Sequence, residues 1–107
     1  MKFTRVVIVD DHVMLRDGIA SILQKEPDFE VVGEAGSVAG AIEKVQASKP
    51  DLVLMDYGLP DGTGLDATKE ILAANPQTDI VLLTVHEEDD LLFAAIRSGA
   101  KGYLLKN

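Results

Sequence analysis

The sequence predicts an α/β fold, a doubly wound sheet of five parallel strands with helices on both of its faces. Short runs of β-branched and other apolar residues alternate with segments whose apolar residues recur at helical spacing. Several of the runs are apolar throughout, as expected for strands that are covered on both sides. Four of the five runs end in a polar residue or are directly followed by one, at the edge where open parallel sheets bind ligands.

In the first half of the chain we expect two strands, at residues 5–9 and 29–33, and two helices. The first helix carries the apolar stripe Leu15, Ile19, Ile22 and Leu23, and the second carries Val38, Ile42 and Val45. Pro27 lies just beyond the first helix, and Ser37 is a candidate N-cap for the second.

In the second half we expect strands at residues 52–55, 80–84 and 102–105, again separated by helices. The apolar stripes are Leu65, Thr68, Ile71 and Leu72 in the third helix and Leu91, Leu92, Ala95 and Ile96 in the fourth. Asn75-Pro76 ends the third helix, and Gly99 is placed to stop the fourth.

The composition is that of an ordinary globular domain, with 47% hydrophobic and 26% charged residues in a chain of 107. The net charge of −8 argues against a general affinity for nucleic acid or for an anionic membrane. The absence of cysteine excludes disulfides and thiolate chemistry. The apolar run at residues 6–9 is too short for a signal peptide or a membrane span, so a cytoplasmic location is expected.

The polar residues at the strand ends are Asp10 and Asp11, Asp56, Thr84 and Lys106. If the first and third strands are neighbours, three carboxylates converge and raise one another's pKa unless a cation neutralises them. A hard divalent cation such as Mg²⁺ suits these oxygen ligands. A hydroxyl and an ammonium group facing that cation are what a transferring phosphoryl group requires.

Each of these residues also has a purely structural interpretation. Asp10 and Asp11 could cap the first helix, Asp56 could be a turn residue, and Thr84 and Lys106 could be ordinary strand and surface residues. Four such signals on one edge of one sheet favour a functional site over four separate structural roles.

The loop after Asp56 is rich in residues that allow a sharp turn and a close approach to a ligand, namely Gly58, Pro60, Gly62 and Gly64. A plain glycine-rich turn explains this loop equally well. His12 and His86 lack partners at metal-ligand spacing, and we interpret both as exposed residues at helix starts.

The segments "VVIVDDHVMLRDGI", "LVLMDYGLPDGTGLD", "IVLLTVHEED" and "AIRSGAKGYLLKN" resemble the receiver domain of bacterial two-component response regulators. The first and last resemble most the NarL/FixJ-type subgroup, which carries a LuxR-type DNA-binding domain. The resemblance covers nearly the whole chain, in order and with matching spacing. It implies a flavodoxin-like sheet with strand order 2-1-3-4-5.

The resemblance also implies a role for each strand-end residue. Asp56 matches the phosphoacceptor, and Asp10 and Asp11 match the acidic pair that holds Mg²⁺ together with Asp56 and the backbone carbonyl of Gly58. Thr84 and Lys106 match the residues that contact the phosphoryl group, and Tyr103 matches the aromatic switch residue. Pro60 and Gly64 match the loop signature of the family.

The implied function is a signalling switch, not an enzyme, that accepts a phosphoryl group from a sensor histidine kinase. The implied state is a homodimer that binds neither membrane nor, by itself, nucleic acid. DNA binding and transcription regulation would belong to a helix-turn-helix effector domain that is absent from residues 1–107. Members of the family continue past the lysine into a fifth helix, so we expect a receiver domain that lacks this helix and leaves a sheet face uncovered.

Three alternative functions fit the sequence less well. A Mg²⁺-dependent phosphatase of the haloacid-dehalogenase type needs a second aspartate two residues after the nucleophile, whereas Asp61 follows Asp56 by five. A receiver that works without phosphorylation would lack the acceptor or the acidic pair, and this chain has both. A flavodoxin-like cofactor binder needs a phosphate-cradling loop after the first strand, where Asp10 and Asp11 would repel a phosphate.

Overall fold

The computed structural model describes residues 3–85 and 89–106 and contains the predicted five-stranded parallel sheet. Its strands lie in the order β2-β1-β3-β6-β7, which is the expected order 2-1-3-4-5 once two short strands of a hairpin are left out of the count. The five strands are β1 (Thr4–Val9), β2 (Phe29–Ala35), β3 (Leu52–Asp56), β6 (Asp79–Thr84) and β7 (Gly102–Leu105). The predicted fold class is therefore confirmed.

Two features of the sheet were not predicted. The glycine-rich loop contains a small antiparallel hairpin of β4 (Gly58–Leu59) and β5 (Gly62–Thr63). Strand β2 also runs two residues further than expected, because Ala35 pairs with Val9 and its carbonyl accepts a hydrogen bond from the Asp10 N–H at 3.0 Å.

All four predicted helices are present: α1 (Val13–Gln24), α2 (Val38–Ser48), α3 (Gly64–Ala74) and α4 (Asp89–Ser98). Ser37 is the N-cap of α2, as predicted, and its hydroxyl accepts a hydrogen bond from the Gly40 N–H at 3.0 Å. Helix α3 ends immediately before Asn75-Pro76. Gly99 follows α4 with a φ of +101°, a conformation that favours glycine. In the described part of the chain, no helix is both long and apolar enough to cross a membrane.

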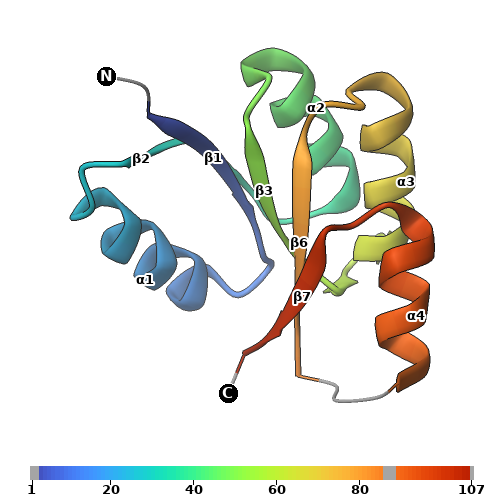
Figure 1. The fold of residues 1–107 in the computed structure, drawn as a ribbon. Helices are drawn as coiled ribbons and strands as arrows, with labels where there is room; N and C mark the ends of the chain where they lie inside the picture. Colours follow the sequence, from blue (N-terminus) through green and yellow to red (C-terminus); the bar gives the residue numbers. More distant parts are fainter. Residues whose placement is uncertain (1–2, 86–88, 107) are drawn as a thin grey trace.

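The helices divide unequally between the two faces of the sheet (Figure 1). Helices α2, α3 and α4 cover one face and form the larger core with the sheet. Its fully buried members are Val7, Val9, Ala41, Val45, Val53, Met55, Ala67, Ile80 and Ala95. Helix α1 lies on the other face, where Val6, Ile8 and Ala20 form a smaller cluster.

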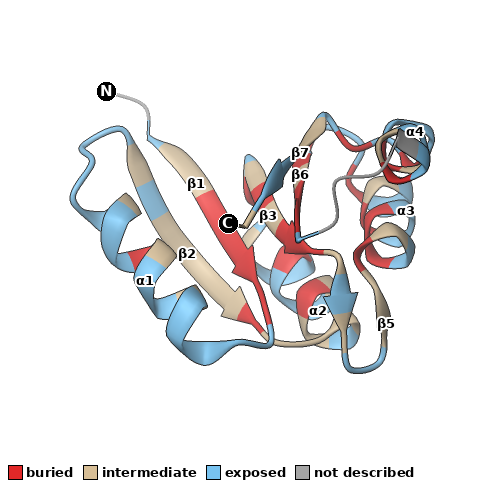
Figure 2. Cartoon of the chain, turned by 90° about the horizontal axis from the view of Figure 1, so that it is seen from below, coloured by how far each residue is buried: buried red, intermediate tan, exposed pale blue. Residues whose placement is uncertain are grey.

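The smaller cluster buries less of α1 than its apolar stripe predicts. Ile19 and Leu23 pack against the cluster, but Leu15 and Ile22 are exposed, and Ala20 is the buried residue of the helix (Figure 2). Helix α1 contacts mainly β1 and β2. Its apolar stripe is wider than this contact surface, so the residues at the edges of the stripe stay exposed to solvent. On the same side of the sheet, Leu104 of β7 is 57% exposed.

Gly64, predicted to shape the loop, is required by close packing at the start of α3. A Cβ at this position would collide with the backbone carbonyl oxygen of Asp56 and lie 3.0 Å from side-chain atoms of Leu82 and Met55. Pro60 lies exposed in the turn between β4 and β5. Gly64 therefore lets α3 begin directly beside the end of β3.

We expect Gly64→Ala to lower the free energy of unfolding by about 1–3 kcal/mol, because the added methyl group overpacks this contact. The matched control is Gly18→Ala in α1, where an added Cβ would meet nothing else in the described chain within 4 Å. Better helix propensity should make the control more stable by about 0.5–1 kcal/mol. Urea unfolding of both variants measures the difference, and a loss of similar size in both would contradict the packing explanation.

Candidate functional site

Three of the polar residues predicted at the strand ends, Asp56, Thr84 and Lys106, line one open pocket at the carboxyl edge of the sheet. The pocket is lined by His12, Asp56, Tyr57, Gly58, Thr84, Val85 and Lys106. Asp56 ends β3 and Thr84 ends β6, and both are almost completely buried. Lys106 follows β7 and reaches the pocket because its N–H donates to the Thr84 carbonyl at 2.8 Å, which continues the strand pairing.

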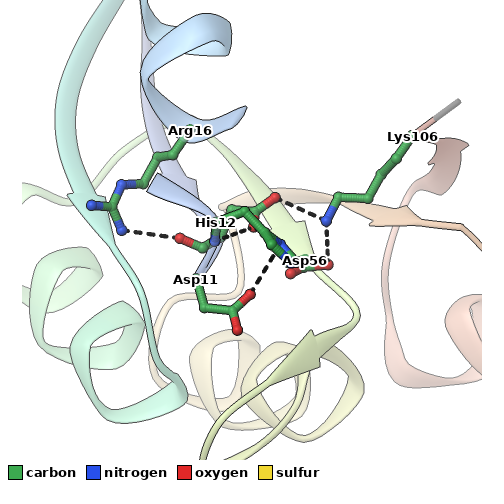
Figure 3. Close-up of polar contacts among 6 residues, drawn as sticks. Asp11, His12, Arg16, Asp56 and Lys106 are labelled. Atoms are coloured by element: carbon green, nitrogen blue, oxygen red, sulfur yellow. Dashed lines mark hydrogen bonds and ion pairs between the residues drawn. The ribbon is translucent and has the colours of Figure 1, made fainter. Parts of the chain in front are cut away.

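Lys106 bridges two buried carboxylates (Figure 3). Its Nζ donates a hydrogen bond to Asp56 Oδ1 at 3.0 Å and lies 3.0 Å from Asp10 Oδ2 as an ion pair. Asp10 is fully buried and Asp56 is 4% exposed. Two carboxylates this deep in a protein require a positive charge, and the lysine supplies one.

The two carboxylates respond differently to this environment. Burial alone would raise the pKa of Asp10, but its contacts with the His12 backbone N–H, with the Lys106 ammonium and with the His12 ring lower it below its usual value. Burial raises the pKa of Asp56, the charge of Asp10 adds to this, and the hydrogen bond from Lys106 only partly compensates. The pKa of Lys106 is raised, because its bonds to both carboxylates outweigh its own burial.

Two carboxylate oxygens in this cluster, Asp10 Oδ2 and Asp56 Oδ2, are buried and receive no hydrogen bond from the described residues. Asp10 Oδ2 has the nearby charge of Lys106, although not in hydrogen-bond geometry. The free-energy cost is larger for Asp56 Oδ2, because burial of a carboxylate oxygen without a hydrogen-bond donor is unfavourable. An added cation would satisfy it.

A group of possible metal ligands surrounds these oxygens. One ligand atom from each of Asp10, Asp11, His12 and Asp56 lies within 4.8 Å of the others. Carboxylate oxygens in this number suit a divalent cation that keeps part of its water shell. The residues present therefore fit a bound metal ion.

His12 was missed as a member of this cluster. It is the N-cap of α1 with a largely exposed side chain, as predicted, but its Nδ1 lies 2.9 Å from Asp10 Oδ1 and 3.2 Å from Asp11 Oδ1. Asp10 folds back onto the helix start and accepts the His12 backbone N–H at 2.8 Å. The adjacency of Asp10, Asp11 and His12 before a helix is the signal that could have indicated this contact. His86 lies outside the described residues.

Arg16 of α1 is a second residue that was not predicted. Its Nη1 donates to the backbone carbonyl of Asp10 at 3.0 Å (Figure 3). Its Nε donates to Glu34 Oε1 at 3.2 Å. The arginine thereby ties the loop after β1 to the neighbouring strand β2. It holds the acidic pair in place from behind the pocket.

Tyr103 lies apart from the pocket in this structure. It is half-buried on β7, pairs with Leu82 of β6 and packs against the larger core on the α2–α4 side of the sheet. The structure therefore gathers Asp10, Asp56, Thr84 and Lys106 at the carboxyl edge of the sheet, whereas Tyr103 does not line the pocket.

Asp61, in the turn between β4 and β5, fastens the loop after Asp56 to α2. Its two carboxylate oxygens accept the backbone N–H groups of Val38 at 2.7 Å and Ala39 at 3.1 Å. These bonds lower the pKa of Asp61. The carboxylate thus caps a helix instead of entering the pocket, unlike the second aspartate of the phosphatase alternative.

Comparison with known proteins agrees with this geometry. Residues 6–107 match the model of the response regulator receiver domain family. The chain is 40% identical over 103 residues to the DNA-binding transcriptional activator DevR/DosR of Mycobacterium tuberculosis, covering 96% of this chain and 48% of that protein. It is 43% identical over 104 residues to the oxygen regulatory protein NreC of Staphylococcus haemolyticus, with the same two coverages. The chain thus spans about half the length of these curated relatives.

Solved structures give the same result. The signal receiver domain of the response regulator NarL from Mycobacterium tuberculosis superposes with a TM-score of 0.95 at 34% identity, covering 100% of this chain and 86% of that one. A LuxR-family two-component response regulator from Aurantimonas sp. SI85-9A1 gives a TM-score of 0.94 at 31% identity, covering 99% and 76%.

The lowered pKa of Asp61 predicts how its contribution to stability depends on pH. The contribution should be complete above about pH 4, where unfolded aspartate is ionised, and should be lost as the pH falls through the folded pKa. Asp61→Ala should therefore lower the melting temperature at neutral pH and approach the wild type in acid. Thermal unfolding over this range tests it, with exposed Asp17→Ala of α1 as control. A pH-independent difference would contradict the cap.

The raised pKa of Asp56 predicts the opposite pH dependence of stability from that of Asp61. The ionised form costs stability in the folded state, and this cost appears as the pH rises through the folded pKa. Asp56→Asn should therefore be more stable than the wild type at neutral pH in buffer with EDTA. The gain should disappear below about pH 4, where the unfolded carboxyl is also protonated.

Thermal unfolding of the wild type and Asp56→Asn over this pH range measures the difference. Asp17→Asn is the control for the loss of one negative charge from the surface. A wild type more stable than Asp56→Asn at neutral pH without metal would mean that Lys106 fully compensates the burial of Asp56, contrary to the raised pKa.

Proposed function

The chain belongs to the response regulator receiver domain family, and we propose on this basis that it is a phosphorylation-controlled switch of a two-component system. The observation that carries the proposal is the buried Asp56 carboxylate. One of its oxygens is held by Lys106, while the other, Oδ2, receives no hydrogen bond from the described residues and belongs to a residue lining the pocket. A carboxylate oxygen without a donor keeps its lone pairs available for a new bond.

In the proposed reaction, a carboxylate oxygen of Asp56 attacks the phosphorus of a phosphohistidine on a sensor histidine kinase. A new O–P bond forms, the P–N bond breaks, and the imidazole of the kinase leaves. The ammonium of Lys106, already within hydrogen-bond distance of Asp56, neutralises charge on the phosphoryl oxygens. The raised pKa of Asp56 reflects how poorly its charge is otherwise stabilised.

Asp10, Asp11, Asp56 and the backbone carbonyl of Gly58 would hold a Mg²⁺ ion in this pocket. The bound ion would favour ionised Asp56 and neutralise negative charge on the incoming phosphoryl group. Arg16 and Asp61 would serve this site indirectly, the first by holding the loop of Asp10 and the second by fixing the hairpin that begins at Gly58.

Thr84 and Tyr103 would couple phosphorylation to a conformational change at the surface of the domain. Thr84 lines the pocket at the end of β6, and Tyr103 lies on the neighbouring strand β7, so a movement of Thr84 would act on the strand that carries Tyr103. A phosphoryl group brings charge and strong acceptor oxygens, which would draw in the Thr84 hydroxyl. The affected surface is the one formed by β6, β7 and α4.

The names of the relatives suggest the output. DevR/DosR is a DNA-binding transcriptional activator, and the matched region is about half of its length. We infer that the whole protein regulates transcription in the cytoplasm, through a helix-turn-helix domain and as a homodimer. The receiver itself would then be a non-enzymatic module that does not contact DNA.

The test is incubation of the protein with acetyl phosphate and Mg²⁺, followed by intact mass. We expect a phosphoryl adduct on the wild type that is lost in Asp56→Asn and in the presence of EDTA. Asp17→Asn, which changes an exposed aspartate of α1 outside the pocket, should still be labelled. Steady release of phosphate that depends on Asp61 would favour the phosphatase instead. A folded wild type that gives neither adduct nor release would refute the switch.

A further inference from the structure

We propose that His12 is a nitrogen ligand of the cation site beside Asp56, which gives this chain a mixed site that binds imidazole-preferring divalent ions such as Co²⁺ and Zn²⁺. The inference rests on the proposed function only in that both use the same cation site. It adds a ligand that the carboxylates and the Gly58 carbonyl do not provide, and it changes the class of metal that the site accepts.

The first support is the fixed position of His12. Its backbone N–H donates to Asp10 Oδ1 at 2.8 Å, and its carbonyl accepts the Arg16 N–H at 2.9 Å, so the residue is held on both sides at the start of α1. Its Nδ1 lies 2.9 Å from Asp10 Oδ1 and 3.2 Å from Asp11 Oδ1 (Figure 3). The imidazole therefore lies among the carboxylates without a rearrangement of the backbone.

The second support is independent of His12. Asp56 Oδ2 is buried and receives no hydrogen bond within residues 3–85 and 89–106, although Asp56 Oδ1 is bonded to Lys106. Lys106 also sits at Asp10 Oδ2, whereas His12 sits at Asp10 Oδ1. The lysine and the imidazole thus approach Asp10 through different oxygens, and the need for a cation at Asp56 Oδ2 remains.

The chemistry of these donors separates two classes of metal. Mg²⁺ prefers oxygen ligands and retains water, so it gains little from an imidazole. Zn²⁺ and Co²⁺ bind imidazole strongly, and a site that combines histidine with carboxylates suits them. Loss of the His12 ring should therefore weaken the binding of Zn²⁺ and Co²⁺ more than the binding of Mg²⁺.

The experiment is calorimetric titration of the wild type, His12→Asn and His86→Asn with Co²⁺, Zn²⁺ and Mg²⁺ in turn. Asparagine keeps the preferred N-cap chemistry at the start of α1, so His12→Asn should fold. We expect it to lose at least about tenfold in Co²⁺ and Zn²⁺ affinity, the least that removal of even an indirect metal partner usually costs. Its Mg²⁺ affinity should change by less than about twofold.

His86→Asn is the matched control, because the chain has two histidines and any exposed imidazole binds some Zn²⁺. A loss of affinity that follows His86, or an equal loss for all three ions in His12→Asn, would overturn the proposal. Imidazole resonances of the wild type provide a second measurement that needs no variant. Stoichiometric Zn²⁺ should shift those of His12 before those of His86.

Labelling with acetyl phosphate and Mg²⁺ separates this inference from the proposed function. If Asp56 is labelled while His12→Asn binds Co²⁺ and Zn²⁺ like the wild type, only the role of His12 is refuted. If folded wild type is never labelled but its Co²⁺ and Zn²⁺ affinities depend on His12, the metal site stands and the switch does not.

Discussion

The shared contact of Lys106 with Asp10 and Asp56 is the interaction on which the rest of the site depends. It places one positive charge between two carboxylates that the fold buries at the ends of β1 and β3. Without a cation in this position, two carboxylates would be buried without an opposite charge between them. The parallel sheet makes the contact possible, because β1, β3 and β7 all end at the same edge. The architecture thus concentrates charge at one edge and supplies one lysine to balance part of it.

Around this contact, each acidic group is held in position by different hydrogen bonds or packing contacts. Arg16 fixes the main chain of Asp10 from α1, and the His12 N–H orients its side chain. Gly64 lets α3 begin against the carbonyl of Asp56, and Asp61 fastens the following hairpin to α2. These supports come from three helices, so the precision of the pocket depends on both layers that cover the sheet.

The fold and the core of the site were predictable because they depend on local patterns and on topology. Alternation of apolar runs and helical stripes defined the sheet, and the residues after each run gave Asp10, Asp56, Thr84 and Lys106. The contacts of Arg16 and Asp61 were not predictable, because they depend on side-chain direction across elements that are distant in sequence or on a turn of unknown shape. The contact of His12 with Asp10 had a signal in the sequence, the adjacency of the two residues before a helix, which was missed. The exposure of Ile22 was missed for a related reason: periodicity locates an apolar stripe but not the width of the surface that covers it.

The ion pair between Lys106 and Asp10 also has a consequence for folding, since it joins residues that lie 96 positions apart in the sequence. Contacts of such long range form late, because the entropy of closing the intervening loop must first be repaid. The pocket is therefore complete only when β7 has docked on β6 and the whole sheet is in place. A chain still emerging from the ribosome, or one with a frayed last strand, has its acids without their lysine. The contact of Lys106 with Asp56 therefore forms only after β7 has paired with β6.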